Sequence, residues 1–299
     1  CGFYRSCVYC GSQYAVGRVG RNLFLCFLTS LAYESEGEDD NVSGQLTVAY
    51  AFADNINAYA TYSTAFKTFG LNNNGIPLDS ANQPVLELAS IKPEDTKHIE
   101  IGLKTEPFPG VVANITAFHT TINDFQVSVS SNQSGTLRGY LANAGKVLVQ
   151  GVEFDGSWRV NDNFNLYGNL AYTDGKYESF TEAPPALEDS GGAIGFVDAS
   201  GTRLPGLSLW AASFGGEYKF DGEFAKRQGE FFVALDASYR SEFSSSATES
   251  DYLNVDGYTL VNARAGFRGD DGWGFYGWTR NALREEDFEM LRAARSSSG

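Results

Sequence analysis

Metal chemistry would need clustered cysteine and histidine side chains, and the sequence offers few of either. The four cysteines all lie near the N-terminus: Cys1, Cys7, Cys10 and Cys26. Cys7 and Cys10 have the spacing of a zinc knuckle, but no second pair of ligands follows them. The two histidines, His98 and His119, fall in predicted strands far along the chain. We therefore interpret the cysteines as incidental thiols, and we expect no metal site and no cofactor.

Acid–base and nucleophilic catalysis are also poorly supported. Adjacent carboxylates such as Asp39–Asp40, Asp270–Asp271 and Glu285–Glu286 lie in predicted loops or in the tail. Such pairs are typical of solvated surface charge. The sequence contains no Gly-x-Ser-x-Gly elbow, no His-Glu-x-x-His motif, no phosphate-binding loop and no Gly-x-Gly-x-x-Gly opening a helix. We therefore predict no catalytic residues and no enzymatic activity.

The composition excludes one class of partner and leaves the membrane open. The chain has 299 residues and a formal net charge of −15, which would repel the phosphates of a nucleic acid. No run approaches the ~18 consecutive apolar residues of a transmembrane helix. A β-strand that crosses a bilayer turns only alternate residues to lipid, so its mean hydropathy stays modest. Aromatic residues make up 14%, which suits a barrel with aromatic girdles.

The elements that would position a polar site are long strands, most clearly within residues 93–127. Ile99, Ile101 and Leu103 alternate with polar or small residues, so one face of this segment is apolar. A turn at 106–110 interrupts the pattern, which resumes from Val111. Strands of about ten residues exceed the ordinary length of about five to six and match the roughly nine to eleven that span a bilayer. The pattern favours a membrane hairpin.

Short and long connections alternate from residue 43 onward. Beyond the 93–127 hairpin, strands are predicted at 43–52, 56–66, 147–158, 164–173, 208–220, 230–241, 258–268 and 273–281. Long loops are predicted at 67–92, 128–146, 174–205 and 242–256, and a medium connection at 221–229. An outer-membrane barrel carries short turns at its periplasmic end and long loops at its extracellular end. A soluble sandwich has Greek-key crossings and no reason for this regularity.

Some segments carry patterns more specific than alternation. Pro93-Glu94 is followed by Glu100, Gly102 and Lys104, and the tyrosine-rich strand 58–67 ends in Ala-Phe-Lys. The first pattern resembles the Pro-Glu…Glu-x-Gly-x-Lys strand of TonB-dependent outer-membrane receptors of the siderophore-receptor type. The second is similar to a strand of the same family that often ends in Gly-Phe-Lys. Weaker similarities to family segments occur at 117–126, 144–153, 170–174, 278–281 and 288–299.

This resemblance implies an all-β fold in the bacterial outer membrane. We expect an antiparallel transmembrane β-barrel that is partial, with about ten of the family's roughly 22 strands and with the plug domain and closing strand absent. Residues 1–42 would be a poorly matching N-terminal segment, 43–281 the partial barrel, and 282–299 a loop or tail before the missing last strand. Expected partners are outer-membrane lipid and, in the full-length protein, TonB, whose contact segment is not in this chain.

The resemblance also implies a function, TonB-dependent uptake of a ferric siderophore or similar iron complex. Uptake of another scarce nutrient (cobalamin, haem or an oligosaccharide) and a passive porin-like barrel remain alternatives, and a soluble β-rich enzyme or lectin is a third class. Candidate ligand contacts are polar residues opposite the apolar faces and residues near the 67–92 loop: Tyr62, Phe66, Lys67, Glu100, Lys104 and Arg264. Solvation of an aqueous interior explains the charged residues as well, and an aromatic girdle explains Tyr62 and Phe66.

Overall fold

The computed structural model describes residues 40–286 except 73–75, 77–78, 80–82, 134–135, 187, 190–195 and 248–249. It also describes the backbone of two short strands, β1 (Arg18–Val19) and β2 (Asn22–Leu23). Within 130–138 it describes the backbone of every residue except 134–135, and no side chains. Most of the segment predicted at 1–42 and of the tail predicted at 282–299 therefore lies outside the described residues.

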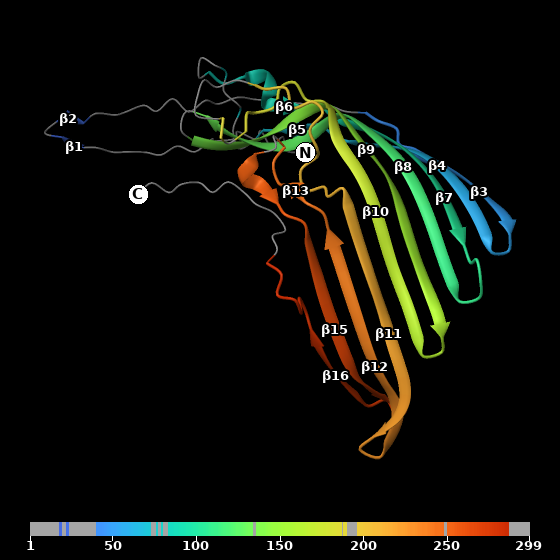
Figure 1. The fold of residues 1–299 in the computed structure, drawn as a ribbon. Helices are drawn as coiled ribbons and strands as arrows, with labels where there is room; N and C mark the ends of the chain where they lie inside the picture. The colour runs from blue at the N-terminus through green and yellow to red at the C-terminus, as the bar shows by residue number, and fades with distance from the viewer. Residues whose placement is uncertain are drawn as a thin grey trace, which may run out of the picture.

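Ten strands form one antiparallel sheet in which each strand pairs with the next of the ten in chain order (Figure 1). They are β3 (Gly44–Ala53), β4 (Ile56–Lys67), β7 (Glu94–Thr105), β8 (Val111–Gln133), β9 (Thr136–Asn161), β10 (Phe164–Ser179), β11 (Trp210–Phe224), β12 (Arg227–Arg240), β15 (Tyr258–Gly269) and β16 (Gly274–Thr279). The sheet is a curved wall whose edge strands, β3 and β16, do not pair with each other. This confirms the prediction of a partial, all-β barrel.

Small elements occupy the long connections. β5 (Gly70–Leu71) pairs with β6 (Ser90–Ile91), and β13 (Phe243–Ser244) pairs with β14 (Asn254–Val255). The described helices are two short 3₁₀ turns, η1 (Leu86–Ala89) and η2 (Asp251–Leu253). In the part of the chain that the structure covers, no helix has the length and apolar character needed to cross a membrane.

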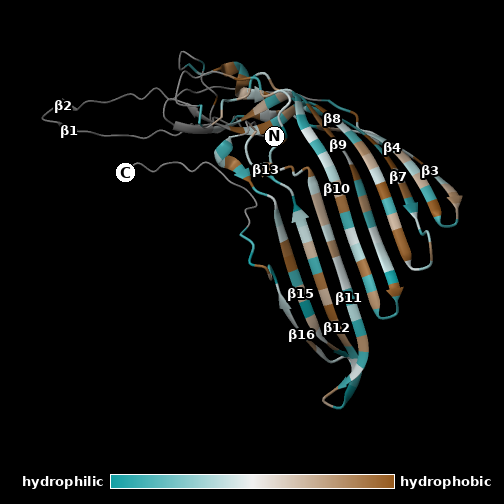
Figure 2. Cartoon of the chain, in the orientation of Figure 1, coloured by the Kyte–Doolittle hydropathy of each residue, from teal (hydrophilic) through white to brown (hydrophobic). Residues whose placement is uncertain are grey.

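The strand register aligns apolar residues in rows that cross the sheet. Ile101 of β7 lies directly opposite Ala60 of β4 and Ala117 of β8. These rows form what we call the apolar face, and the alternate residues form the polar face; Figure 2 shows the alternation. Ile101 and Leu235 are each 57% exposed on the apolar face. An exposed apolar surface of this extent is expected to contact an apolar environment. The strands of a membrane barrel turn such a surface to lipid, which agrees with the prediction of membrane strands.

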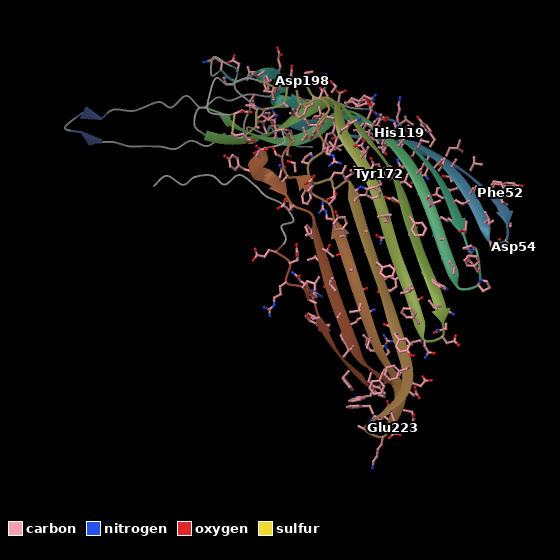
Figure 3. The ribbon with its side chains drawn as sticks, viewed as in Figure 1. Phe52, Asp54, His119, Tyr172, Asp198 and Glu223 are labelled. Atoms are coloured by element: carbon pink, nitrogen blue, oxygen red, sulfur yellow. The ribbon has the colours of Figure 1, made fainter. Side chains whose placement is uncertain are left out.

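Short turns lie at one end of the sheet and long loops at the other, with Asp54 and Glu223 near the short turns and Asp198 among the loops (Figure 3). The medium connection predicted at 221–229 is wrong. β11 and β12 are joined by Ala225 and Lys226 alone, with φ of 51° and 65°. Two residues in the left-handed region suit the twist of a two-residue hairpin, but neither is the Asn or Gly that signals one in a sequence.

The loop predicted at 128–146 is also wrong, because β8 and β9 continue through it as a hairpin. Val127 and Val129 lie opposite Ala142 and Tyr140, and all four side chains are buried. Their burial stabilises strand in a segment whose Ser, Asn and Gly content is typical of a loop. We call the part of this hairpin beyond Asn123 and Lys146 the arm, with its described side chains at 124–129 and 139–145. Figure 1 shows the arm bending across the long-loop end of the sheet.

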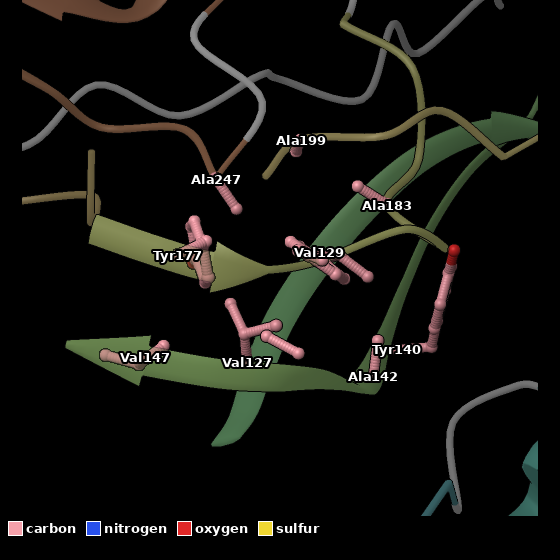
Figure 4. Packing of buried hydrophobic residues seen from close by; sticks show 11 residues of the cluster. Val127, Val129, Tyr140, Ala142, Val147, Tyr177, Ala183, Ala199 and Ala247 are labelled. Carbon is pink, nitrogen blue, oxygen red and sulfur yellow. The ribbon is translucent and has the colours of Figure 1, made fainter. Parts of the chain in front are cut away.

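A hydrophobic core lies where the arm meets the long loops (Figure 4). Arm residues pack there with Val147 and Tyr177 of the sheet, with Phe180, Ala183 and Ala199 from the β10–β11 connection, and with Ala247 from the β12–β15 connection. Val147 and Tyr177 follow the same alternation as the polar-face residues Gly151 and Tyr167. The arm and loops therefore cover the polar side of the wall at this end.

Candidate functional site

The first polar-face cluster is built around a tyrosine that covers a glycine. Tyr59 of β4 lies directly opposite Gly102 of β7, and a Cβ at Gly102 would overlap the Tyr59 ring. The ring can therefore lie flat across β7. The Tyr59 hydroxyl donates to Oε1 of Glu100 at 2.7 Å and lies 3.2 Å from Oγ1 of Thr116 on β8. One side chain thus links three strands, β4, β7 and β8.

Lys104 and His98 also belong to this cluster. Nζ of Lys104 lies 5.5 Å from the centre of the Tyr59 ring, a distance at which a cation is attracted to the ring face. His98 pairs through Nε2 with Oε2 of Glu100 at 3.4 Å, and its Nδ1 lies 2.8 Å from Oγ1 of Thr120. The structure therefore brings the predicted residues Glu100 and Lys104 to one site, through Tyr59.

The second cluster is an ion-pair network on β11, β12 and β15 that contains the predicted residue Arg264. Nη1 of Arg268 lies 3.1 Å from carboxylate oxygens of both Glu217 and Glu230, and its Nη2 donates to the second Glu217 oxygen at 3.2 Å. Arg264 contacts Glu217 at 3.6 Å, and Lys219 contacts Glu230 at 2.9 Å. Three cations thus share two carboxylates on the polar face.

The pairing of an aromatic ring with an opposing glycine recurs across the polar face. The directly opposed pairs are Tyr59–Gly102, Phe118–Gly151, Tyr167–Gly215 and Phe232–Gly266. In the third pair the Tyr167 hydroxyl reaches past Gly215 to donate to Asp236 on β12. In the fourth, the Arg268 guanidinium lies 3.9 Å from the centre of the Phe232 ring. At Gly102, Gly151 and Gly215 a Cβ would come within 3 Å of the opposing ring, so these three glycines leave space for the aromatic side chains that face them.

The other predicted candidates lie elsewhere. Tyr62 and Phe66 belong to the apolar face, where Tyr62 lies opposite Leu46 and Ile99. Lys67 is at the long-loop end, where its Nζ lies 3.2 Å from Oε1 of Glu94. The six candidates thus occupy separate regions, and only Glu100 and Lys104 share a cluster. Their role as ligand contacts stays a prediction.

Glu94 belongs to a network that ties the β4–β7 connection to the arm. Its carboxylate accepts a hydrogen bond from the backbone N–H of Gln126 at 2.7 Å, while Nε2 of Gln126 donates to the carbonyls of Thr68 and Lys92. The amide of the nearly buried Asn72 donates to the carbonyls of Leu88 and Leu141 and accepts from the N–H of Leu141. This connection is therefore held in a defined position against the arm.

A carboxylate joins the other two long connections. Glu188 accepts a hydrogen bond from the backbone N–H of Asp251 at 2.8 Å and one from the hydroxyl of Ser250 at 2.7 Å. These two hydrogen bonds, the backbone one first, lower the pKa of Glu188 below its ordinary value. Glu188 therefore remains ionised and bonded at neutral pH.

Sequence reasoning missed Tyr59, Arg268 and Glu217 as site residues. Each alternates with residues of the apolar face, so strand parity places it on the polar face. The contact between Arg268 and Glu217 spans three strands, however, and depends on a register that one strand's pattern does not contain. Among the described residues, no group of three or more His, Cys, Asp or Glu side chains could hold a metal ion. The clusters can offer hydrogen bonds and charges to a polar ligand or to a protein segment.

Two curated receptors are similar in sequence to this chain. The ferric-pyoverdine M114 receptor PbuA of Pseudomonas sp. (strain M114) is 27% identical over 237 residues, which cover 77% of this chain and 25% of the receptor. The pesticin receptor of Yersinia pestis is 26% identical over 215 residues, covering 69% of this chain and 29% of the receptor. The chain thus spans about a quarter of the length of these curated relatives.

Solved structures show the same fold, and a family model matches most of the chain. The ferric yersiniabactin uptake receptor FyuA from Yersinia pestis superposes with a TM-score of 0.67 at 17% identity, over 91% of this chain and 37% of that one. The siderophore receptor PiuA from Acinetobacter baumannii gives 0.64 at 18% identity, over 89% and 35%. The model of the TonB dependent receptor-like β-barrel matches residues 20–282. The chain belongs to this family of receptors and transporters, whose members are proteins of the Gram-negative outer membrane.

Proposed function

We propose that the full-length protein containing this chain takes up a ferric siderophore, or a similar iron complex, in a TonB-dependent manner. The observation that carries the proposal is the family membership combined with the names of the curated relatives. One is a receptor for ferric pyoverdine, and another, from Acinetobacter baumannii, is described as a probable TonB-dependent siderophore receptor. The chain's part in this activity is to form a wall of the barrel, with no catalytic step.

The two faces of the wall suit this role. The apolar face would contact outer-membrane lipid, and the polar face would line an aqueous interior. On the polar face, Glu100, Lys104 and Arg264 would meet whatever fills or passes through that interior. Lys67, at the extracellular end, would meet a ligand arriving from outside. TonB would act through parts of the full-length protein other than this wall.

Growth and uptake assays test this proposal. A strain that lacks the receptor gene is complemented with the full-length gene and grown on a panel of ferric siderophores as sole iron source, with uptake of radioactive iron measured for each chelate. We expect rescue on at least one chelate, and we expect disruption of TonB to abolish it.

Two results would overturn the proposal. Rescue that persists without TonB would favour a passive porin-like barrel. Failure on every iron chelate, combined with TonB-dependent uptake of cobalamin, haem or an oligosaccharide, would assign the receptor to another nutrient.

A further inference from the structure

An aromatic cluster lies on the apolar face at the short-turn end of the wall, the end that Glu223 marks in Figure 3. One row across β11, β12, β15 and β16 consists of four directly opposed phenylalanines, Phe220, Phe231, Phe267 and Phe275. The centres of neighbouring rings in this row are 5.4, 4.9 and 6.3 Å apart. Phe267 is only 1% exposed, although it lies on the face that is open elsewhere. Side chains of the protein itself therefore cover the apolar face here.

The cover comes from the two turns at this end of the sheet. The ring of Phe224, at the end of β11, lies 4.9 Å from that of Phe275 on β16, although β12 and β15 separate these strands. It also stacks on Trp273 of the β15–β16 turn, with ring centres 6.3 Å apart. Phe224 can reach this far because the row between it and the phenylalanines contains no side chains on β11, β12 and β15, where it consists of Gly222, Gly229 and Gly269. The β11–β12 and β15–β16 turns are thus packed together on the apolar side.

Charged side chains lie beside these rings. Arg227, the first residue of β12, pairs with Asp271 of the β15–β16 turn, and its guanidinium lies 5.5 Å from the centre of the Trp273 ring. The side chains of Arg227 and Asp271 are 48% and 46% exposed, so both can also bind a molecule outside the protein. Lys226, the preceding residue, is exposed as well. The two turns therefore present a cation and an anion side by side, next to aromatic rings.

The position of Arg227 along β12 sets its depth in the membrane. Tyr239 and Phe231 lie on the apolar face, four residues on either side of Leu235. For a strand that rises ~3.3 Å per residue and tilts by ~40°, the two aromatic residues are about 20 Å apart in depth. Leu235 therefore lies near the middle of the apolar band, and the aromatic residues lie near its edges. Arg227 is four residues beyond Phe231, a further ~10 Å that places it among lipid headgroups.

We propose that these two turns bind the headgroup of a zwitterionic phospholipid in the periplasmic leaflet, one that carries both a phosphate and an ammonium group. Lys226 and Arg227 bind the phosphate, since a guanidinium has five N–H donors and can serve Asp271 and a phosphate together. The Asp271 carboxylate binds the ammonium group, and the acyl chains lie against Phe275 and its neighbours. The proposal rests on the apolar face contacting lipid, and it does not depend on which ligand the receptor takes.

The charges of the two turns favour a zwitterion over an anion. Glu223, Asp270 and Asp271 supply three carboxylates, against the two cations Lys226 and Arg227. This excess of negative charge repels a headgroup that carries a phosphate alone. A zwitterion avoids that repulsion, because its ammonium group meets the carboxylates while its phosphate meets the cations.

Native mass spectrometry of the purified full-length receptor tests the proposal, with equal amounts of phosphatidylethanolamine and phosphatidylglycerol added in detergent. The unaltered receptor should retain mainly phosphatidylethanolamine. Arg227→Gln should lower that retention by about two- to fivefold, the effect expected of one partly exposed charge contact. Arg268→Gln is the matched control, since Arg268 also pairs with a carboxylate and lies over an aromatic ring, but on the polar face. Equal retention in the two variants would overturn the proposal, and so would preferred retention of phosphatidylglycerol by the unaltered receptor.

A second variant separates headgroup binding from a purely structural role of the ion pair. Asp271→Asn keeps the size of the side chain but removes the charge that binds ammonium and repels anions. It should therefore lower the retention of phosphatidylethanolamine and raise that of phosphatidylglycerol. An ion pair that only held the two turns together would make Asp271→Asn and Arg227→Gln lose both lipids alike, and this result would overturn the proposal. The heat-dependent gel shift of a folded barrel verifies that each variant is folded before its lipids are compared.

Discussion

The ring of Tyr59 lies across Gly102 on the neighbouring strand, and the Tyr59 hydroxyl donates to Glu100 two residues away on that strand. The pair shows how the polar face is organised. A glycine, which contributes little as a strand former, supplies the space in which an aromatic residue can reach its polar partners. Replacing the glycine should therefore disturb the aromatic residue and its hydrogen bonds.

We predict that Gly102→Ala destabilises the barrel by about 1–3 kcal/mol, because the new methyl group overlaps the Tyr59 ring and displaces it. Urea unfolding of the purified receptor in detergent measures the change. Gly44→Ala is the matched control, since a Cβ on the strand residue Gly44 meets no atom within 4 Å. Equal stability of the two variants would show that the ring moves aside without cost.

The Arg268 network should contribute stability that depends on salt. Its members are partly exposed, so we expect Arg268→Ala to cost only about 1 kcal/mol at low ionic strength. Part of that cost should vanish at ~1 M salt, where screening weakens the attraction to Glu217 and Glu230. Urea midpoints at the two salt concentrations measure the effect. A cost that is the same at both would assign the contribution to the packing of Arg268 on Phe232.

The assignment of one side of β12 to lipid and the other to the interior predicts that arginine substitutions on the two sides change stability differently. Leu235→Arg places a charge on the lipid-facing side and should destabilise the barrel by about 2–4 kcal/mol. Ser238→Arg, on the same strand but on the polar face, should be tolerated. The fraction of receptor that shows the heat-dependent gel shift of a folded barrel distinguishes them. Assembly that fails equally in both variants would contradict the assigned orientation of β12.

The hydrogen bonds by which Glu188 of the β10–β11 connection holds Ser250 and Asp251 of the β12–β15 connection should weaken in acid. The pKa of Glu188 is lower in the folded state than the ordinary 4.5. The stabilisation that ionised Glu188 gives to the folded state is therefore fully present above pH 4.5, and it is lost as the pH falls through the folded-state pKa. Exchange at the backbone N–H of Asp251, corrected for its intrinsic pH dependence, should therefore rise in acid. Glu188→Gln should show raised exchange already at neutral pH, with a flatter pH profile below 4.5.

The membrane strands could be predicted because their pattern is local. Ile99, Ile101 and Leu103 alternate on a single strand, and nothing distant is needed to see that one face is apolar. The arm could not be found in this way. Val127 and Val129 are stabilised as strand by burial against loops far along the chain, so tertiary packing overrides a composition that resembles a loop.

The polar clusters could be predicted from the sequence only in part. Parity placed Glu100, Lys104 and Arg264 on the polar face, but it could not show that Glu100 bonds Tyr59 or that Arg264 meets Glu217. Those contacts depend on which residues lie opposite one another across two or three strands. The turn at Ala225 and Lys226 was missed for a different reason, since neither residue type signals a left-handed conformation.

The strict alternation of faces constrains how such a barrel can change in length. A single residue inserted in the middle of β7 would turn Glu100 and Lys104 toward hydrocarbon and bring Ile101 into contact with water, which two inserted residues would avoid. Insertions of any size can instead accumulate beyond the membrane, where the backbone is free to change direction. Variation in ligand choice among relatives should therefore arise mainly through the lengths of their extracellular segments, while the wall keeps its strand lengths in steps of two.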